Sequence, residues 1–456
     1  MRHHDLVVIG TGSGNMIIDE RFDGLDVAVV EQTAFGGTCL NVGCIPTKML
    51  AYAAEVAHTV RQASDYGVDA HVDKVRWPDI RDRVFSRLDP ISADGRKGRE
   101  ESDNVTVYLG HAEFSGPRAL TVTGDAGTQE FTADRIVIAA GGRPMVPPPV
   151  EKSGVHYETS DSIMRIDEIP GRLAIIGGGY IAAEFAHVFG GLGAEVTIID
   201  VADSLLSALD ETVSERFTEI ARDRFDVRVG RSAEKVESAG DGVRLTLDDG
   251  STVEADRLLV AAGRVPNGDR LNLGAAGIDT HDDGRIAVDP YLRTSVDGVF
   301  ALGDVSSPVQ LKHSANHEAT VVQYNLLNPD AMREVDLNLV PAAVFASPQI
   351  GMIGRTEQQC CDEGLDYRTV VQPYSDVAYG WALEDRTGFC KLIADPSTGQ
   401  LLGAHVLGPQ APTMVQQLVQ AMALQVPVKR LAEVQYWIHP GLTEVLENAL
   451  RGLDLD

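Results

Sequence analysis

The beginning of the chain combines short apolar runs with a glycine-rich turn. Residues 6–9 (Leu-Val-Val-Ile) are apolar and largely β-branched, and three glycines occupy the turn after them, namely Gly10, Gly12 and Gly14. Such a run predicts a buried strand, and we expect a helix to begin within residues 16–20. A second apolar run at residues 27–30 predicts another strand, which ends at Glu31. The chain therefore opens with a strand, a glycine turn, a helix and a second strand.

The same order of elements recurs in the middle of the chain. A strand is predicted over residues 173–176, and the turn after it contains Gly177 and Gly179. We expect a helix over residues 183–189 and a further strand over residues 196–199. Two units of one kind are therefore predicted, each with the topology of a dinucleotide-binding fold.

A second internal repeat supports this duplication. Residues 133–144 (ADRIVIAAGGRP) return in closely similar form at residues 255–266 (ADRLLVAAGRVP), and we expect each copy to close one unit. From residue 340 onward, predicted strands mix with helical periodicity, as at residues 414–422, where apolar residues recur at helix spacing. This change predicts a third domain.

Composition excludes several classes of protein. The chain has 456 residues, 44% of them hydrophobic and 23% charged, as expected of a multidomain globular protein. Its 67 acidic and 39 basic residues give a net charge of −28, which would repel nucleic acids and anionic membranes. No run approaches the ~18 consecutive apolar residues of a membrane helix. The first apolar run ends in a glycine turn without a cleavage-like site, so we expect a cytoplasmic protein with no nucleic acid or membrane partner.

The two glycine turns have the features of pyrophosphate-binding loops. Such turns let the backbone approach the phosphates at the start of a helix. Glu31 follows Gly10 by 21 residues and Asp200 follows Gly177 by 23, close to the ~20 expected for a carboxylate that binds ribose. The first turn departs from the fingerprint at Asn15, where Gly or Ala is usual.

The chain has five cysteines, and two of them lie in a suggestive setting. Cys39 and Cys44 are separated by four residues, and in an ideal helix their Cα atoms would be about 7.5 Å apart along the axis, beyond the ~7 Å limit of a disulfide. A bridge therefore requires an irregular turn, which Asn41 and Gly43 permit. A helix predicted over residues 49–58 would favour a thiolate through its N-terminal dipole. Two buried reduced cysteines or half of a metal site are the alternatives.

Three histidines merit attention. His439 is followed five residues later by Glu444, and a histidine held by a carboxylate can exchange the protons that thiol chemistry needs. A structural histidine is the alternative. His313 and His317 have metal-like spacing, but no cysteine or third histidine accompanies them, so no metal site is predicted.

Three segments together resemble one protein family. GGTCLNVGC at residues 36–44, TSVDGVFALGDV at 294–305 and HPGLTE at 439–444 are similar in sequence and order to motifs of the flavoprotein disulfide reductases. This family, the class I pyridine nucleotide-disulfide oxidoreductases, includes glutathione reductase and dihydrolipoamide dehydrogenase. The resemblance extends through nearly the whole chain.

Other segments indicate a branch within this family. GTGSGN at residues 10–15, DVAYGWALED at 376–385 and QYWIHPGLTEVLENAL at 435–450 resemble the members that reduce mycothione, the disulfide of mycothiol. Dihydrolipoamide dehydrogenase or another low-molecular-weight disulfide reductase is the alternative. An alternative of another class is a non-catalytic flavin redox sensor, for which the adjacent Cys360 and Cys361 could serve as a switch; unreactive thiols are the simpler interpretation of that pair.

The resemblance implies an α/β fold with two Rossmann-like dinucleotide-binding domains, for FAD and NAD(P), plus an α+β C-terminal dimerisation domain. The implied boundaries are 1–147 and 267–337 for the two parts of the FAD-binding domain, 148–266 for the NAD(P)-binding domain and 338–456 for the interface domain.

The resemblance also implies the residues that bind FAD. The three glycines of the first turn would contact the pyrophosphate, Glu31 the adenosine ribose and Asp304 the flavin side chain, while Thr38, Lys48 and residues 310–313 would lie at the isoalloxazine end. The implied FAD residues are Gly10, Gly12, Gly14, Glu31, Thr38, Lys48, Ala112, Ala140, Gly141, Asp304, Gln310, Leu311, Lys312 and His313.

A second set is implied for the nicotinamide nucleotide. Tyr180 would cover the nicotinamide pocket, and Glu184 would pair with Lys48 beside the flavin. The implied NAD(P) residues are Gly177, Gly179, Tyr180, Ile181, Glu184, Asp200, Val201, Ala262 and Gly263. No arginine follows Asp200 in the chain until Arg216, and a carboxylate suits a free 2'-hydroxyl better than a phosphate. We therefore expect NADH to be favoured, with NADPH as the alternative if a distant arginine such as Arg264 contributes.

The resemblance assigns catalysis to Cys39, Cys44, His439 and Glu444. Electrons would pass from the nicotinamide through FAD to Cys44, Cys39 would attack the disulfide substrate, and His439, oriented by Glu444, would protonate the leaving thiolate. In this family the histidine comes from the second subunit, so a homodimer formed through residues 340–456 is implied.

Overall fold

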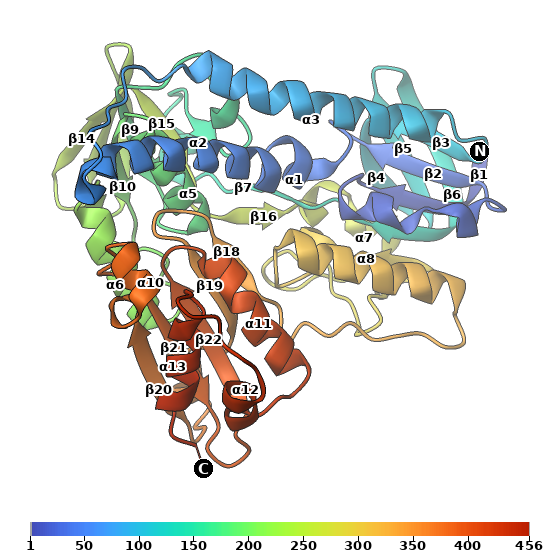
Figure 1. The fold of residues 1–456 in the computed structure, drawn as a ribbon. Coiled ribbons are helices and arrows are strands. Elements are labelled where there is room, and N and C mark those ends of the chain that lie inside the picture. Colours follow the sequence, from blue (N-terminus) through green and yellow to red (C-terminus); the bar gives the residue numbers. More distant parts are fainter. Residues whose placement is uncertain (1, 456) are drawn as a thin grey trace. The chain divides into compact units, whose positions relative to one another are not determined.

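The computed structural model describes residues 2–455, which divide into two compact units. The first comprises residues 2–49, 79–145 and 264–337, and the second comprises residues 50–78, 146–263 and 338–455. Figure 1 labels their helices and strands. Within residues 2–455, no helix is both long and apolar enough to cross a bilayer.

A seven-stranded sheet is the centre of the first unit. Strands β1, β2, β3, β6 and β17 are parallel, whereas β4, β5 and β6 form an antiparallel meander. Alternate residues of β1 enter two different apolar clusters, which explains its continuous apolar run: both faces of the sheet are covered. The strands are β1 Arg2–Ile9, β2 Val27–Glu31, β3 Val105–Leu109, β4 His111–Gly116, β5 Ala119–Gly124, β6 Gly127–Ile138 and β17 Val299–Ala301.

The helix predicted to begin within residues 16–20 is absent, so that prediction was wrong. Two short 3₁₀ helices, η1 Ser13–Ile17 and η2 Glu20–Phe22, replace it, and Ile18 and Asp19 between them are extended. The Asp19 carboxylate accepts a hydrogen bond from the backbone N–H of Arg21 and pairs with its guanidinium. Such local side-chain bonds compete with helix formation.

Helices and a small ribbon complete the first unit. The helix predicted over residues 49–58 lies within α2, which begins earlier, at Cys44. Strands β7 and β16 pair in antiparallel fashion and come from the two copies of the internal repeat. The elements that lie in this unit, wholly or in part, are α1 Gly37–Asn41, α2 Cys44–Gln62, α3 Trp77–Glu100, α7 Leu273–Ala276, α8 Lys312–Leu327, β7 Gly142–Pro144 and β16 Arg264–Pro266, with 3₁₀ helices η5 Asn267–Arg270 and η6 Gly303–Val305.

The second unit contains a five-stranded parallel sheet of Rossmann type. Its strand order is β11-β10-β9-β15-β8, and α5 follows β9 as predicted, beginning three residues earlier than expected. A three-stranded antiparallel sheet, β12-β13-β14, accompanies it. The elements are β8 Glu158–Thr159, β9 Arg172–Ile176, β10 Glu195–Ile199, β11 Asp226–Arg228, β12 Ala233–Ala239, β13 Gly242–Leu247, β14 Thr252–Ala255, β15 Arg257–Val260, α4 Pro148–Glu151, α5 Tyr180–Gly191 and α6 Glu211–Arg222, with η3 Ala63–Tyr66 and η4 Ile163–Arg165.

The C-terminal part of this unit is built on a second antiparallel sheet. The strand order is β18-β19-β22-β21-β20, and helices α11 and α13 share one apolar cluster with β21 and β22. The elements are β18 Ala342–Val344, β19 Ile350–Gly354, β20 Arg368–Pro373, β21 Phe389–Ala394, β22 Leu401–Leu407, α9 Glu357–Asp362, α10 Ala378–Ala382, α11 Ala411–Ala423, α12 Val428–Val434, α13 Glu444–Gly452 and η7 Tyr374–Asp376. The predicted fold class, two Rossmann-like domains and an α+β domain, is confirmed.

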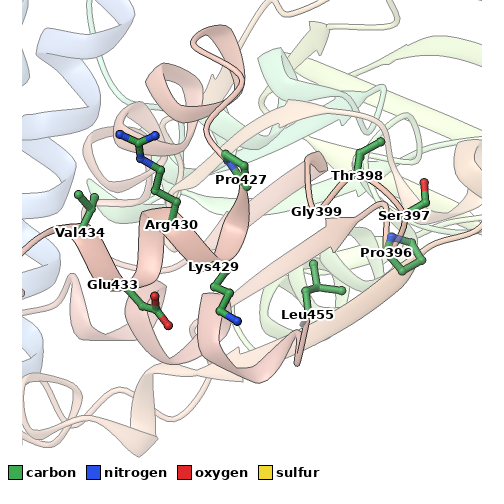
Figure 2. Close-up of a pocket in the computed structure, with 10 residues that line it drawn as sticks. All are labelled: Pro396, Ser397, Thr398, Gly399, Pro427, Lys429, Arg430, Glu433, Val434 and Leu455. Carbon is green, nitrogen blue, oxygen red and sulfur yellow. The ribbon is translucent and has the colours of Figure 1, made fainter.

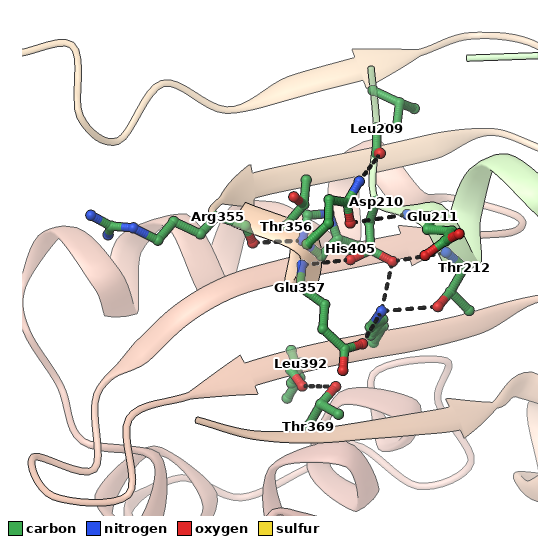
Figure 3. Close-up of polar contacts among 12 residues, drawn as sticks. Leu209, Asp210, Glu211, Thr212, Arg355, Thr356, Glu357, Thr369, Leu392 and His405 are labelled. Carbon is green, nitrogen blue, oxygen red and sulfur yellow. Dashed lines mark hydrogen bonds and ion pairs between the residues drawn. The ribbon is translucent and has the colours of Figure 1, made fainter. Parts of the chain in front are cut away.

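Within the second unit, a buried ion cluster joins the start of α6 to α9 and to strand β21 of the C-terminal antiparallel sheet. Lys391 of β21 is 2% exposed, and its Nζ lies 2.8 Å from Asp210 Oδ1, 2.9 Å from Thr212 Oγ1 and 2.6 Å from Glu357 Oε2. Asp210 also accepts hydrogen bonds from the N–H groups of Thr212 and Glu357, so one carboxylate caps both α6 and α9 (Figure 3). Burial alone would raise the pKa of Asp210. The hydrogen bonds from the Glu357 N–H and from Lys391 outweigh this effect, so the pKa lies below its ordinary value.

Candidate functional site

The first glycine turn forms a cradle lined by backbone. Gly10 has a φ of 96°, and a Cβ there would overlap the carbonyl oxygen of Ala139; a Cβ on Gly14 would lie 2.7 Å from the Ala139 Cβ. At Gly12 the nearest atom to an added Cβ is 3.8 Å away, the Cα of Gly37. The turn is therefore closed against the sheet and open at Gly12, which fits the close approach of a pyrophosphate.

Glu31 is buried at the end of β2, beside this turn. Its Oε2 accepts hydrogen bonds from the Thr11 N–H (3.0 Å) and hydroxyl (2.6 Å), and its Oε1 accepts from the Thr33 N–H (2.9 Å). These bonds fix the carboxylate at the carboxyl edge of the parallel strands, where dinucleotide folds bind the ribose.

Asp304 lies in η6, directly after β17. The η6 turn is held by Glu318, whose Oε2 accepts a hydrogen bond of 2.6 Å from the Gly303 N–H. Burial raises the pKa of Asp304, and the positive charges of Arg264 and Lys312 oppose this shift. The side chain of Arg264 is buried, with its Nε 3.7 Å from Asp304 Oδ2. Arg264 is therefore occupied beside Asp304, within the first unit.

Cys39 and Cys44 lie close together at a break between two helices. Cys39 is in α1, and Cys44 is the first residue of α2, so residues 42–43 between them form the irregular turn that a disulfide bridge would require. A hydrogen bond from the Cys44 side chain is the main cause that lowers the pKa of Cys39 to about 7, against the effect of burial; the charge of Lys312 and the N–H groups of Cys44 and Ile45 contribute. The start of α2 therefore favours the Cys39 thiolate.

The other residues implied for FAD are spread over the first unit. Among them, Lys312 links the glycine turn to the cysteine pair, because its Nζ donates a 3.0 Å hydrogen bond to the Ser13 hydroxyl and its charge lowers the pKa of Cys39. Gln310 and Arg264 line a cavity of about 220 Å³. The remaining positions are Thr38 in α1, Lys48 in α2, buried Ala112 in β4, Ala140 and Gly141 after β6, Leu311 at the N-cap of α8, and His313 in its first turn.

The second glycine turn, in the second unit, has the same backbone restraint. Gly177 has a φ of 117°, and a Cβ there would overlap the carbonyl oxygen of Ala261. At Gly179, an added Cβ would meet no atom within 4 Å. Asp200 follows β10 and accepts a 2.7 Å hydrogen bond from the Ala202 N–H. This turn also fits a pyrophosphate, and Asp200 lies where a ribose would bind.

Two arginines lie near Asp200 that chain spacing did not reveal. Arg228 ends β11, which runs parallel to β10, and the Arg231 N–H donates to the Asp200 carbonyl oxygen at 2.9 Å. The Arg228 guanidinium pairs with Asp226 at 2.7 Å, and that of Arg231 pairs with Asp249 at 2.9 Å. Both positive charges therefore have a carboxylate partner.

The remaining residues implied for NAD(P) lie in the same unit. Tyr180 is the first residue of α5 and is 42% exposed, and Glu184, one turn later, accepts a 2.9 Å hydrogen bond from the Phe345 N–H. Ile181 is half-buried in α5, Val201 is exposed after Asp200, and Ala262 and Gly263 follow β15.

His439 and Glu444 interact directly in the second unit. His439 Nδ1 lies 2.8 Å from Glu444 Oε1, and Glu444 Oε2 accepts a 3.1 Å bond from the Gly441 N–H. These bonds, that of His439 first, lower the pKa of Glu444 and keep it ionised. His439 is 71% exposed, so its other ring nitrogen is available to a proton acceptor or donor.

The other cysteines, a metal site and the C-terminal cavity are further candidates for a functional site. Cys360 and Cys390 are buried and burial raises the pKa of each thiol, whereas Cys361 is exposed on α9. Residues 2–455 include no group of three or more acidic, cysteine or histidine side chains arranged to hold a metal. A cavity of about 590 Å³ between the turn at residues 396–399 and α12 contains none of the implied site residues (Figure 2).

Sequence reasoning missed the residues that support the first turn. Arg99 of α3 and Gln323 of α8 hold residues 15–19, and Asn316 accepts a 2.9 Å hydrogen bond from the Ser13 hydroxyl. The signal in the sequence was Asn15, where the fingerprint was already broken.

Comparison with known proteins agrees with this geometry. Residues 4–319 match the family "Pyridine nucleotide-disulphide oxidoreductase", and residues 340–450 match the dimerisation domain of that family. Mycothione reductase of Mycobacterium tuberculosis is 53% identical over 460 aligned residues, which cover 99% of this chain and 100% of the relative. Dihydrolipoyl dehydrogenase of Halobacterium salinarum is 33% identical, covering 98% and 95%.

Solved structures show the same relationship. The HOCl-induced flavoprotein disulfide reductase RclA of Escherichia coli superimposes with a TM-score of 0.86 at 28% identity, covering 98% of this chain and 99% of that one. LpdA of M. tuberculosis gives a TM-score of 0.86 at 26% identity, covering 99% and 100%. With its two glycine turns, its cysteine pair and its C-terminal interface domain, the chain belongs to the pyridine nucleotide-disulphide oxidoreductase family.

Proposed function

We propose that this protein is a cytoplasmic enzyme that reduces mycothione to mycothiol, using a reduced nicotinamide, FAD and a redox-active pair formed by Cys39 and Cys44. The observation that carries the proposal is the placement of Cys39 and Cys44 on either side of the break between α1 and α2; the pKa of Cys39, lowered to about 7 beside Cys44, supports it. The 53% identity to mycothione reductase over the whole chain supports the choice of substrate.

The first glycine turn, Glu31 and Asp304 would hold FAD, and the second turn and Asp200 would hold the nicotinamide nucleotide. The backbone cradles at Gly12 and Gly179, each open to an added Cβ, support these two assignments. Bound FAD would accept a hydride from the nicotinamide and deliver the electron pair to a disulfide between Cys44 and Cys39.

The cysteines then exchange with the substrate. The Cys39 thiolate attacks one sulfur of mycothione; the substrate S–S bond breaks and one mycothiol thiolate leaves. Cys44 attacks Cys39 in the resulting mixed disulfide, which re-forms the Cys39–Cys44 bond and releases the second mycothiol. A thiol with a pKa near ambient pH is well suited to the first step, because it is both ionised and nucleophilic.

His439 would protonate the departing thiolates. Glu444 accepts the hydrogen bond from Nδ1, which leaves Nε2 to carry the proton. We further propose a homodimer in which His439 of each subunit completes the active site of the other. The matched dimerisation domain and the exposed apolar side chains around His439 support this arrangement; these are Val434, Tyr436 and Ile438, the last 76% exposed.

NADH is proposed as the favoured cofactor, with NADPH as the alternative. Asp200 offers a carboxylate to a free 2'-hydroxyl, and the nearby Arg228 and Arg231 already pair with Asp226 and Asp249.

The test is steady-state reduction of mycothione, glutathione disulfide and lipoamide by the purified holoenzyme, each with NADH and with NADPH. We expect mycothione to give the highest kcat/KM, and Cys39→Ser to lower that value at least about a thousandfold while NADH still reduces the flavin. Cys361→Ser is the matched control and should be unaffected.

A higher kcat/KM for lipoamide would assign the protein to the dihydrolipoamide dehydrogenases instead. A single reduction of the flavin without turnover on any disulfide would favour a redox sensor.

A further inference from the structure

Two side chains donate hydrogen bonds to four consecutive carbonyl groups behind the first glycine turn. In an α-helix, the carbonyls of residues 15–18 would accept N–H groups four residues later, but residues 13–22 form only short 3₁₀ helices. Arg99 Nη2 donates to the carbonyl oxygens of Asn15 and Ile18, each at 2.9 Å. Gln323 Nε2 donates to those of Ile17 at 2.9 Å and Met16 at 3.3 Å.

The same two side chains also anchor the polar groups of this segment. Arg99 Nε donates a 2.8 Å hydrogen bond to the Asn15 side chain, and Gln323 Nε2 donates one of 2.9 Å to Asp19 Oδ2. Arg99 lies near the end of α3, and Gln323 lies in the C-terminal half of α8. Two helices distant in sequence therefore hold residues 15–19 in place.

Helix α8 also fixes the glycine turn itself. Ser13 stands between Gly12 and Gly14, and its hydroxyl donates to Asn316 Oδ1 at 2.9 Å and accepts from Lys312 Nζ at 3.0 Å. The turn and the segment behind it are thus positioned by side chains, in contrast to the second turn, which continues directly into the twelve-residue helix α5.

We propose that Arg99 and Gln323 are positioning residues for FAD: by holding the carbonyls of residues 15–18, they keep the first glycine turn in the conformation that receives the pyrophosphate. This proposal rests on the assignment of FAD to that turn. Without the two side chains, these carbonyls would lose their donors and would turn toward water, and the conformation of the turn would no longer be fixed.

The test is the affinity of apoprotein for FAD, measured by the change in flavin fluorescence, with the dissociation rate measured on the holoenzyme. Arg99→Met keeps most of the apolar stem and removes three hydrogen bonds; we expect FAD affinity to fall at least about tenfold. Arg99→Lys should be intermediate, and Gln323→Leu should weaken FAD binding without changing charge. Arg96→Met is the matched control on α3, because Arg96 is exposed and pairs within the helix, with Glu100.

The apoprotein melting temperature separates positioning from simple stability. Unchanged FAD affinity in both Arg99→Met and Gln323→Leu, with a lowered apoprotein melting temperature, would overturn the proposal. If Arg99→Met does not fold, Gln323→Leu alone decides it. Failure of the wild-type protein to bind FAD would instead overturn the proposed function.

Discussion

The two glycine-rich turns of this chain both begin with a glycine of positive φ, but they differ in the segments that come after them. From Ser13 onward, two 3₁₀ helices separated by extended residues lead to β2, whereas after Gly179 the twelve-residue helix α5 leads to the next strand. In both turns the first glycine has a positive φ and abuts the carbonyl of an alanine in a neighbouring strand connection, Ala139 or Ala261.

This difference separates two requirements that usually coincide. The close approach of a pyrophosphate depends on glycines at fixed positions, which both turns have. The rigidity of the turn can come from a helix, as in the second unit, or from side chains of other helices, as with Arg99 and Gln323 in the first. The first turn depends on residues distant in sequence, so it is more easily broken by a single substitution away from the turn.

The largest expected effect is a loss of stability when the buried ion cluster of Lys391, Asp210 and Glu357 in the second unit is broken. Lys391→Met would leave Asp210 and Glu357 buried or partly buried without their ion partner, and we expect unfolding to become easier by about 3–5 kcal/mol in urea denaturation. Lys429→Met, in α12 of the same unit, is the control. A loss below about 1 kcal/mol would show that the cluster does not support this unit.

The glycines allow the two turns to be broken one at a time. Gly10→Ala and Gly177→Ala each introduce an overlap at a positive φ, which we expect to cost roughly 2–4 kcal/mol, or about a hundredfold in affinity for the nucleotide bound there. Gly10→Ala should lose FAD during purification. Gly177→Ala should keep FAD but be reduced slowly by NADH in stopped-flow measurements.

The control for both variants is Gly24→Ala, where an added Cβ meets no atom within 4 Å. If Gly177→Ala lost FAD, or Gly10→Ala kept it while losing reaction with NADH, the assignment of the two turns would be wrong.

Asp200 tests the chemistry of the second turn. Asp200→Ser removes a charge that opposes a 2'-phosphate, and we expect the ratio of kcat/KM for NADPH to that for NADH to rise about tenfold. Asp203→Ser, in the same loop, should leave the ratio unchanged. A higher kcat/KM with NADPH than with NADH in the wild-type protein would contradict the proposal that Asp200 selects NADH.

The smallest expected effect is a shift in the pKa of the Cys39 thiol. In the two-electron-reduced enzyme, iodoacetamide should alkylate Cys39 with a rate that rises with pH and has a midpoint of about 7, since the thiolate predominates above the pKa. Cys44→Ala removes the main cause of the lowered pKa and should raise the midpoint; Lys312→Met should raise it less. A midpoint of about 9 in the wild-type protein would contradict this origin of reactivity.

The strands and both glycine turns could be predicted from sequence because their signals are local. The apolar runs at residues 6–9 and 173–176 became strands, and Gly10 and Gly177 took the positive φ that such turns need. The cysteine pair lies at a helix break, which is the irregular turn that a bridge between the two residues would require.

The helix predicted after the first turn is absent for one local reason and one distant reason. Ile18, Phe22 and Leu25 have helical spacing, but the Asp19 side chain captures the Arg21 N–H and starts a separate turn. The donors that hold this segment, Arg99 and Gln323, lie far along the chain, and no short motif encodes their contact. Arg228 could not be predicted to lie near Asp200 either, because it is the pairing of β11 with β10 that brings the two residues together.

The pairing of β17 with β6 has a consequence for how the chain is made. Ile138 is the last residue of β6, and its partner strand begins only at Val299, after the whole second Rossmann sheet. At ordinary rates of synthesis the intervening residues take on the order of ten seconds to emerge from the ribosome. During that interval, residues 136–138 of β6 lack the strand that later pairs with them, whereas residues 172–260 can already form their own sheet. During translation, the Rossmann sheet of the second unit, whose last strand ends at Val260, is therefore expected to be complete before the sheet of the first unit, which has to wait for β17.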